Sequence, residues 1–211
     1  MRKLNYFKNT GFTLVEMAIV LVIIGLILGG VLKGQELVVQ ARVKSMISDF
    51  NQVTAAYYTY FDRYHQFPGD DPTAEDRWSA VTCCTGATCG DGTLGAAGTG
   101  YDTGAENKCL WQHLRNAGII NGAVTSDDLP TNPIGGNTGV QDGHAFTTAD
   151  GIIGDAIICT SAVPPEIAEL MDYAIDDGNS KAGILMSGST SSGTPADDYT
   201  GSTDLVVCRV M

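Results

Sequence analysis

The fold of this chain is organised around an apolar segment, Phe12–Leu32, FTLVEMAIVLVIIGLILGGVL. Its 21 residues contain no proline and one ionisable side chain, that of Glu16. At a rise of about 1.5 Å per residue, a helix over this stretch is about 30 Å long, which matches the hydrocarbon thickness of a bilayer. The sequence therefore predicts a membrane-spanning helix.

The segment before this span, MRKLNYFKNTG, carries three basic residues and no acidic residue. Positive charge beside a span holds that end in the cytoplasm, so the chain beyond Lys33 is expected to be exported. A cleaved secretory signal is disfavoured, because its apolar core spans only about 7–15 residues and because no small-x-small cleavage site follows Leu32. A plain membrane anchor leaves Glu16 unexplained, since a charged side chain within a bilayer is costly.

The junction Gly11-Phe12-Thr13-Leu14-Val15-Glu16 lies between the basic leader and the apolar helix. It resembles the N-terminal signature of type IV prepilins and type II secretion pseudopilins, and the resemblance is specific over about the first quarter of the chain. It implies that a membrane-embedded prepilin peptidase cuts between Gly11 and Phe12 on the cytoplasmic side and methylates the new amine of Phe12. It also implies assembly with other pilin or pseudopilin subunits by a machinery of the inner membrane.

The charges at this junction fit such an assembly on physical grounds. A cut before Phe12 leaves an ammonium at the start of a helix, and Glu16 lies one turn further on the same face. In a filament, Glu16 of one subunit could pair with the Phe12 amine of its neighbour, so that two charges that are costly alone become tolerable together. Glycines 25, 29, 30 and 34 either let such helices approach closely or reflect ordinary membrane-helix composition.

The length of 211 residues suits one membrane span and one small exported domain. We expect a leader at residues 1–11, a membrane and assembly helix at 12–34, and an exported domain at 35–211. The net charge is −12 and becomes −15 without the leader, because 24 acidic residues then face nine basic ones. This balance argues against nucleic acid and against an anionic bilayer surface as partners.

The helical pattern continues from Gln35 to Tyr64 without proline or interior glycine. A continuous helix from Phe12 to Tyr64 is about 80 Å long and ends before Phe67-Pro68. Its amphipathic half can pack on a coiled-coil partner or on a sheet of the same chain, and the strand-like segments that follow favour the sheet. Apolar residues recur there at spacings of four and three and form one stripe: Val39, Val43, Met46, Phe50, Val53, Tyr57, Tyr60 and Tyr64.

The rest of the chain alternates turn-rich and regular segments. Residues 73–104 and 121–143 are expected to be irregular, whereas helices are expected from Glu106 to Ala117 and from Pro164 to Gly178. The predicted fold class is α+β, pilin-like, with the long N-terminal helix packed on a small antiparallel sheet domain. Strand signals lie at His144–Thr148, Ile152–Thr160, Ala182–Met186 and Leu205–Met211.

All six cysteines lie in the exported part, where an oxidising environment favours three disulfides over a metal site. Cys159 and Cys208 lie in two of the expected strands, and their pairing resembles the bridge that closes the C-terminal loop of many type IV pilins. A zinc site is disfavoured, because two well-spaced C-x-x-C pairs are absent. The other four cysteines can pair in three ways that the sequence does not distinguish: Cys83, Cys84, Cys89 and Cys109.

No catalytic site and no cofactor are expected. The chain has no G-x-S-x-G, H-E-x-x-H or Walker motif, and its histidines His65, His113 and His144 are scattered. Gly90–Gly95 satisfies G-x-G-x-x-G, but neither a preceding strand nor a following apolar helix supports a nucleotide loop. Calcium, which some pseudopilins bind, is the one alternative, although solvated acidic loops are commoner and no acidic cluster has EF-hand spacing: Asp70-Asp71, Asp172/Asp176-Asp177 and Asp197-Asp198.

The function that these patterns favour is that of a structural subunit of a type IV pilus or a type II secretion pseudopilus. The chain is then a single-pass inner-membrane protein with a cytoplasmic N-terminus and an exported domain, which later enters a pilus or a periplasmic pseudopilus. The alternative is a monomeric, membrane-anchored binding domain outside the cytoplasm. Glu16 and the leader favour the filament subunit, because an anchor needs neither.

Overall fold

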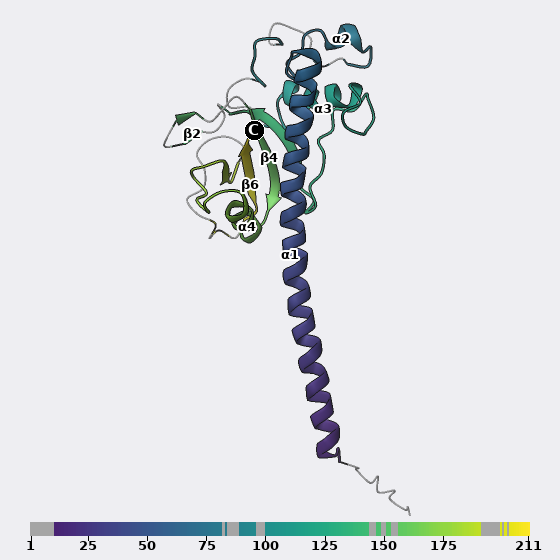
Figure 1. The fold of residues 1–211 in the computed structure, drawn as a ribbon, viewed down its shortest axis with the longest axis vertical. Coiled ribbons are helices and arrows are strands. Elements are labelled where there is room, and N and C mark those ends of the chain that lie inside the picture. Colours follow the sequence, from purple (N-terminus) through teal and green to yellow (C-terminus); the bar gives the residue numbers. More distant parts are fainter. Residues whose placement is uncertain are drawn as a thin grey trace, which may run out of the picture. The chain divides into compact units, whose positions relative to one another are not determined.

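The computed structural model describes residues 11–81, 83, 89–95, 100–143, 147–148, 151–152, 156–190, 199, 201 and 203–211. The chain divides into two compact units, Met1–Ala41 and Arg42–Met211 (Figure 1). The helices in the described residues are α1 (Leu14–Tyr64), α2 (Ala74–Arg77), α3 (Ala105–Asn116) and α4 (Pro165–Ile175). The strands are β1 (Thr138–Asp142), β2 (Thr147–Thr148), β3 (Gly151–Ile152), β4 (Ala156–Val163), β5 (Leu185–Gly188) and β6 (Leu205–Val210).

Helix α1 confirms the predicted long helix and begins at Leu14, slightly later than expected. Within the second unit, the face with the apolar stripe is buried and the opposite face, with Lys44, Gln52 and Asp62, is exposed. The stripe therefore packs on the domain of its own chain, as expected, and not on a coiled-coil partner. Its buried members are Val43, Met46, Phe50, Tyr57 and Tyr60.

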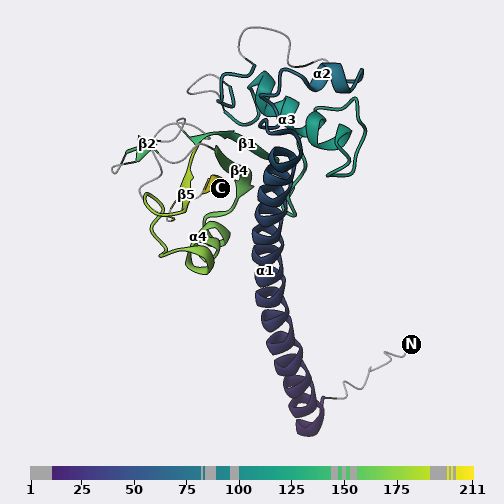
Figure 2. The ribbon, with the colours of Figure 1, turned by 45° about the horizontal axis from the view of Figure 1, so that its top comes forward.

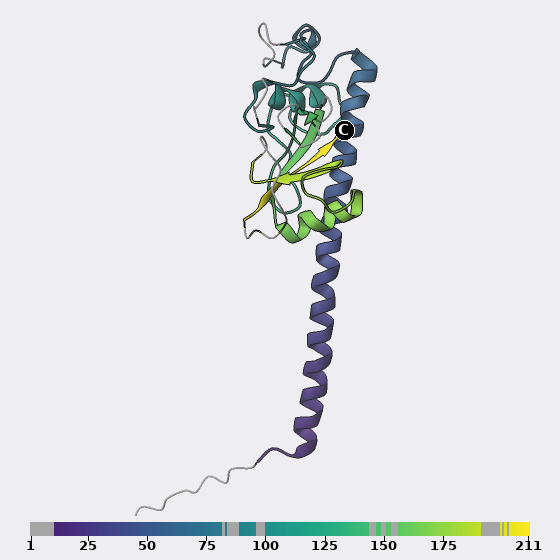
Figure 3. The ribbon, with the colours of Figure 1, turned by 90° about the vertical axis from the view of Figure 1, so that its left-hand side faces the viewer.

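A four-stranded antiparallel sheet lies beside this part of α1 (Figures 1 and 3). The strand order is β1-β4-β6-β5, so the most apolar strands, β4 and β6, are central. Their side chains form much of the core, with Ile157, Ile158 and Val207 fully buried. The arrangement of a long helix on a small antiparallel sheet confirms the predicted α+β fold class.

Arg209 of β6 ties the sheet to α1. Its guanidinium donates hydrogen bonds to Asn51 Oδ1 at 2.7 Å and to Thr54 Oγ1 at 2.8 Å. The same group lies 5.5 Å from the centre of the Phe50 ring, so the apolar stripe and a polar clamp meet on one side of the helix.

Helix α3 confirms the helix predicted at 106–117 and lies beside the C-terminal end of α1 (Figure 2). Its apolar side chains Leu110, Trp111 and Leu114 are buried. The helix stops where expected, because Gly118 adopts φ +67° and donates its N–H to Arg115 O, while Ile119 N–H reaches Leu114 O. Two C-terminal carbonyls are satisfied in this way.

Strand β1 corrects the sequence prediction, since Thr138–Asp142 lies in the stretch 121–143 that was expected to be irregular. The sequence TGVQD has one strongly apolar residue and no alternation, so the usual strand signals are absent. All five residues are nevertheless buried, and a Cβ on Gly139 would meet Tyr101 Cδ2 at 2.4 Å. Close packing against Tyr101, and not local propensity, makes this segment a strand.

Other strand boundaries also differ from the predictions. The segment expected as one strand, Ile152–Thr160, contains Ile152 at the end of β3 and most of β4, and β4 continues to Val163 beyond an irregularity in the register, where Ala162 adopts φ +57°. Strand β5 begins at Leu185, later than predicted, whereas β6 and α4 lie close to their predicted places. Residues 144–146 of the strand predicted at His144–Thr148 lie outside the described residues, and its last two form β2.

Candidate functional site

The predicted processing junction lies immediately before α1, in the first unit. Phe12 is 80% exposed, and a Cβ added to Gly11 would meet no atom within 4 Å. Both residues precede the first helical residue, Leu14, so the bond between them lies in non-helical backbone. The geometry leaves this peptide bond accessible to a protease.

Thr13 and Glu16 close a capping box at the start of α1. The backbone N–H and the hydroxyl of Thr13 each donate to Glu16 Oε2 at 2.8 Å, and the Glu16 N–H donates to Thr13 Oγ1 at 3.3 Å. These reciprocal bonds satisfy backbone donors that the first turn of a helix otherwise leaves without partners. A carboxylate in the first turn also interacts favourably with the helix dipole.

The role of Thr13 is a feature that the sequence analysis missed, although the signal was present. Thr13-Leu14-Val15-Glu16 is the T-x-x-E pattern that precedes many helices. Within the described residues, both hydrogen bonds from Thr13 end on Oε2, and Oε1 of Glu16 accepts none. One oxygen of Glu16 thus organises its own helix and the other is open to a second donor.

The first half of α1 is apolar and exposed throughout. Helix α1 contains a window with a mean hydropathy of 2.7, none of it buried, and is long and apolar enough to cross a membrane. Added Cβ atoms at Gly25, Gly29, Gly30 and Gly34 would meet nothing within 4 Å, so nothing in the described part of the chain requires these glycines. Lys33 and Glu36, paired at 2.7 Å, follow the apolar stretch.

The same N-terminal residues carry a similarity to a known protein family. Residues 6–32 match the family model described as the prokaryotic N-terminal methylation motif. This motif is the signature of type IV prepilins and pseudopilins. It implies processing by a prepilin peptidase and points to a structural subunit more than to an enzyme. Neither a curated protein nor a solved structure matches the chain.

Two disulfides are described in the second unit. Cys159 of β4 and Cys208 of β6 face each other in the register and are joined, which is the pair expected from the sequence. Cys83 is joined to Cys109 of α3, one of the pairings that the sequence left open. Cys89 also belongs to a disulfide, and Cys84 lies outside the described residues.

A polar cluster around the buried Tyr60, Asp71 and His113 joins the end of α1 to α3. Tyr60 donates to Asp71 Oδ2 at 2.7 Å, and the Arg77 guanidinium bonds to both side chains. The ring of His113 stacks on Tyr60 at a centroid distance of 5.9 Å, and its Nδ1 accepts the Gly69 N–H at 3.0 Å. Burial lowers the pKa of His113 to about 4, with the charges of Asp71 and Arg77 acting in opposite directions.

The two histidines within the described residues, His65 and His113, do not form a shared site. His65 is exposed just beyond α1, His113 is buried, and His144 lies outside the described residues. Cys83, Cys109 and His113 come within 4.8 Å of one another, but both sulfurs are already bonded. Since Nδ1 of His113 accepts a hydrogen bond, the neutral ring carries its proton on Nε2 and has no lone pair there for a metal.

The acidic clusters differ in their surroundings. Asp70 accepts the backbone N–H groups of Gly90, Asp91 and Gly92, so the G-x-G-x-x-G stretch holds a carboxylate of its own chain. The carboxylate of Asp71 accepts hydrogen bonds from Tyr60, Thr73 and Arg77. Asp197 and Asp198 lie outside the described residues.

Three acidic clusters are candidate calcium sites in the sequence. Within the described residues, the cluster at the end of α4 is the one whose carboxylates lie close together. The carboxylates of Asp172, Asp176 and Asp177 lie within 4.8 Å of one another. Asp172 is buried, accepts a 2.5 Å hydrogen bond from Tyr199, and has no hydrogen-bond partner on Oδ1 in the described part of the chain. Its pKa is raised, mainly by burial, which the Tyr199 hydrogen bond opposes and the charges of Asp176 and Asp177 reinforce.

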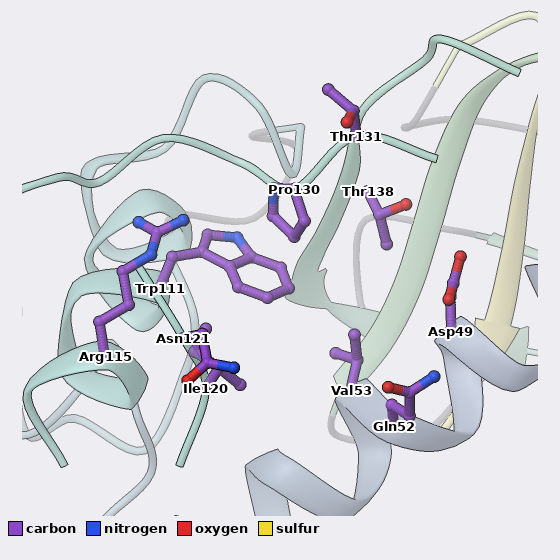
Figure 4. Close-up of a pocket in the computed structure, with 10 residues that line it drawn as sticks. All are labelled: Asp49, Gln52, Val53, Trp111, Arg115, Ile120, Asn121, Pro130, Thr131 and Thr138. Atoms are coloured by element: carbon purple, nitrogen blue, oxygen red, sulfur yellow. The ribbon is translucent and has the colours of Figure 1, made fainter. Parts of the chain in front are cut away.

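A pocket of about 220 Å³ lies between α1, α3, β1 and the loops around residues 120 and 130 (Figure 4). The Trp111 Nε1 and Arg115 Nε donors have no hydrogen-bond partner in the described residues, and burial raises the pKa of Asp49. Among the residues that the structure describes, no cysteine, histidine or serine lines this pocket. The lining residues are Asp49, Gln52, Val53, Trp111, Arg115, Ile120, Asn121, Pro130, Thr131 and Thr138.

Proposed function

We propose that this chain is a subunit of a type IV pilus or of a type II secretion pseudopilus. A prepilin peptidase removes residues 1–11 and methylates the amine of Phe12. The subunit waits in the inner membrane with its domain exported, and an inner-membrane machinery then assembles it with like subunits into a helical filament. The observation that carries the proposal is the capping-box Glu16 at the start of an exposed apolar helix, within the segment that matches the methylation motif.

The free oxygen of Glu16 supports the assembly step. Thr13 occupies Oε2, and Oε1 has no hydrogen-bond partner among the described residues. The cut before Phe12 creates an ammonium, which is a donor that a neighbouring subunit can present to Oε1. Since a charged group in an apolar fibre core is costly without a partner, this pairing selects one axial position of one subunit against the next.

The exposed glycines support the same step. Gly25, Gly29, Gly30 and Gly34 meet no neighbour in the described chain, so their small size is unused in the monomer. Small residues on membrane helices allow the backbones of two helices to approach closely. In a bundle of such helices at the centre of a filament, these glycines lie at the close contacts between helices.

A second candidate, the membrane-anchored binding domain, rests on the pocket beside Trp111. Its two buried donors, Trp111 Nε1 and Arg115 Nε, lack partners among the described residues and suit a ligand with hydrogen-bond acceptors. This candidate needs no leader cleavage and no role for Glu16. The processing experiment therefore separates the two.

The test is co-expression of the full chain with a prepilin peptidase and, as a control, with a catalytically inactive peptidase. Intact-mass measurement is expected to show loss of residues 1–11 and gain of one methyl group on Phe12 with the active enzyme alone. An intact Met1 end, or a cut beyond Leu32, contradicts the proposal.

A further inference from the structure

The Cys83–Cys109 disulfide has two chemically different ends. Cys83 is partly exposed, whereas Cys109 lies in α3 and is fully buried. Thiol–disulfide exchange requires a thiolate to reach one sulfur while the other sulfur leaves. Because Cys83 is the more exposed of the two residues, with Gln112 Oε1 2.9 Å from its Sγ, we take Cys83 Sγ as the sulfur that a thiolate attacks and Cys109 as the sulfur that leaves.

The imidazole of His113 lies beside Sγ of Cys109, the leaving sulfur, and a hydrogen bond fixes which ring nitrogen carries the proton. Its Nδ1 accepts the Gly69 N–H at 3.0 Å, which requires Nδ1 to be unprotonated. The neutral ring therefore carries its proton on Nε2, and Nε2 lies 3.1 Å from Cys109 Sγ. The lowered pKa of His113 keeps the ring neutral near pH 7, so this tautomer is the one present.

We propose that Cys83 is a site of S-thiolation, at which small thiols of the glutathione or cysteine class exchange with the Cys83–Cys109 disulfide. The incoming thiolate forms a bond to Sγ of Cys83, the Cys83–Cys109 bond breaks, and Cys109 leaves as a thiolate. The electron pair of the broken bond stays on Cys109, so no external oxidant or reductant is needed. The Nε2–H of His113 stabilises that thiolate by a hydrogen bond, and a better-stabilised thiolate leaves faster.

The second described disulfide provides an internal comparison. Cys159 and Cys208 are both fully buried, in the two central strands of the sheet. Their sulfurs pack among Tyr101 and Ile157, with Leu129, Val206 and Val210 around them. A thiolate reaches neither sulfur without opening the sheet, so this bond is expected to persist under conditions that exchange Cys83–Cys109.

The experiment treats the oxidised full chain in mild detergent with glutathione at pH 7.5. After an acid quench, the protein is denatured, free thiols are alkylated, and digestion without reduction is followed by fragment-ion mass spectrometry. We expect glutathione on Cys83, the alkyl label on Cys109, and an intact Cys159–Cys208 bond. Glutathione on any other cysteine, or exchange of Cys159–Cys208 at an equal rate, overturns the proposal.

His113→Asn tests the hydrogen-bond donor. An asparagine Oδ1 can accept the Gly69 N–H as Nδ1 does, but the side chain is too short to donate to Cys109. Exchange at Cys83 is expected to slow by about tenfold, while the Cys159–Cys208 bond stays intact. An unchanged or faster rate at Cys83 contradicts the role of His113. The site of glutathione addition in the unsubstituted chain decides the proposal even if this variant does not fold.

Discussion

Tyr60 donates a 2.7 Å hydrogen bond to Asp71 and so joins the last turns of α1 to the segment that follows it. Both side chains are buried, and Asp71 also accepts the N–H and the hydroxyl of Thr73 at 2.9 and 2.8 Å. Burial alone raises the pKa of Asp71, but the hydrogen bonds from Tyr60 and Thr73 and the charge of Arg77 outweigh it and lower the pKa. The carboxylate is therefore ionised in the folded domain and holds the end of α1 in place.

We expect substitutions at the two ends of this hydrogen bond to have unequal costs. Tyr60→Phe removes one donor while Asp71 keeps its other partners, so the free energy of unfolding should fall by about 1 kcal/mol. Asp71→Ala leaves the Tyr60 hydroxyl and the two Thr73 donors without their shared acceptor and should cost about 3 kcal/mol. Urea unfolding of the full chain in detergent measures both values. Equal costs for the two variants would refute this account of the cluster.

The stability of the domain should depend on pH through His113. Burial lowers its pKa to about 4 in the folded state, whereas the pKa of the unfolded side chain is about 6.5. The unfolded state therefore binds more protons between these values, and the contribution of the neutral ring is complete above about 6.5 and declines as the pH falls. The expected loss between pH 6.5 and 4 is about 3 kcal/mol.

The measurement is the free energy of unfolding against pH for the unsubstituted chain and for His113→Asn. The variant keeps an acceptor for Gly69 but does not titrate. Because the other titrating groups are common to both proteins, the difference between the two curves isolates His113 and should change by about 3 kcal/mol between pH 6.5 and 4. Parallel curves would show that His113 is not the group responsible.

Asp172 should destabilise the domain at neutral pH. It is buried beside Asp176 and Asp177 at the C-terminal end of α4, where the helix dipole also opposes negative charge. Because its folded pKa is raised, folding is favoured as the pH falls through that pKa and the carboxyl becomes neutral. Asp172→Asn should therefore raise the free energy of unfolding at pH 7 by about 1 kcal/mol, since the amide keeps an acceptor for Tyr199.

Bound calcium would reverse the effect of Asp172→Asn on the stability of the domain. If the three carboxylates hold a cation, Asp172→Asn removes a ligand and lowers stability when calcium is present. Melting curves with calcium and with a chelator, for both proteins, separate the two outcomes. A gain in stability for the variant under both conditions rules out a cation site that depends on Asp172.

The elements with strong periodic signals could be predicted from the sequence. The apolar stripe from Val43 to Tyr60 fixes α1, and Gly118 ends α3 through its positive φ. The match to the methylation motif could be predicted as well, because Gly11, Phe12 and Glu16 stand in one short motif, whereas the cut between Gly11 and Phe12 stays a prediction. The capping box also has a sequence signal, because Thr13 lies three positions before Glu16 in a T-x-x-E pattern.

The features that sequence could not provide depend on distant contacts. β1 is a strand because Gly139 fits under Tyr101 and because Thr138 and Thr160 share a 3.0 Å hydrogen bond across the sheet. The tautomer of His113 depends on the backbone of Gly69, 44 residues earlier in the chain. Such contacts leave no local pattern, since each is formed by residues that meet only in the folded domain.

We expect the charge of Glu16, and not only its capping role, to serve filament assembly. Glu16→Gln keeps a side chain that can complete the capping box with Thr13 but removes the charge that would pair with the Phe12 amine. Membrane insertion should be at least as efficient, because a charge is removed from an apolar span. Leader cleavage should continue, because the Gly11–Phe12 junction is unchanged.

The most direct measurement is the yield of filaments sheared from cells that carry the assembly machinery, for the unsubstituted chain, Glu16→Gln and Thr13→Ala at matched membrane levels. We expect Glu16→Gln to reduce the yield by about tenfold or more, because the amine of a neighbouring subunit then has no charged partner. Thr13→Ala, which weakens the cap but keeps the charge, should reduce the yield less. Equal yields for the unsubstituted chain and Glu16→Gln would contradict the account.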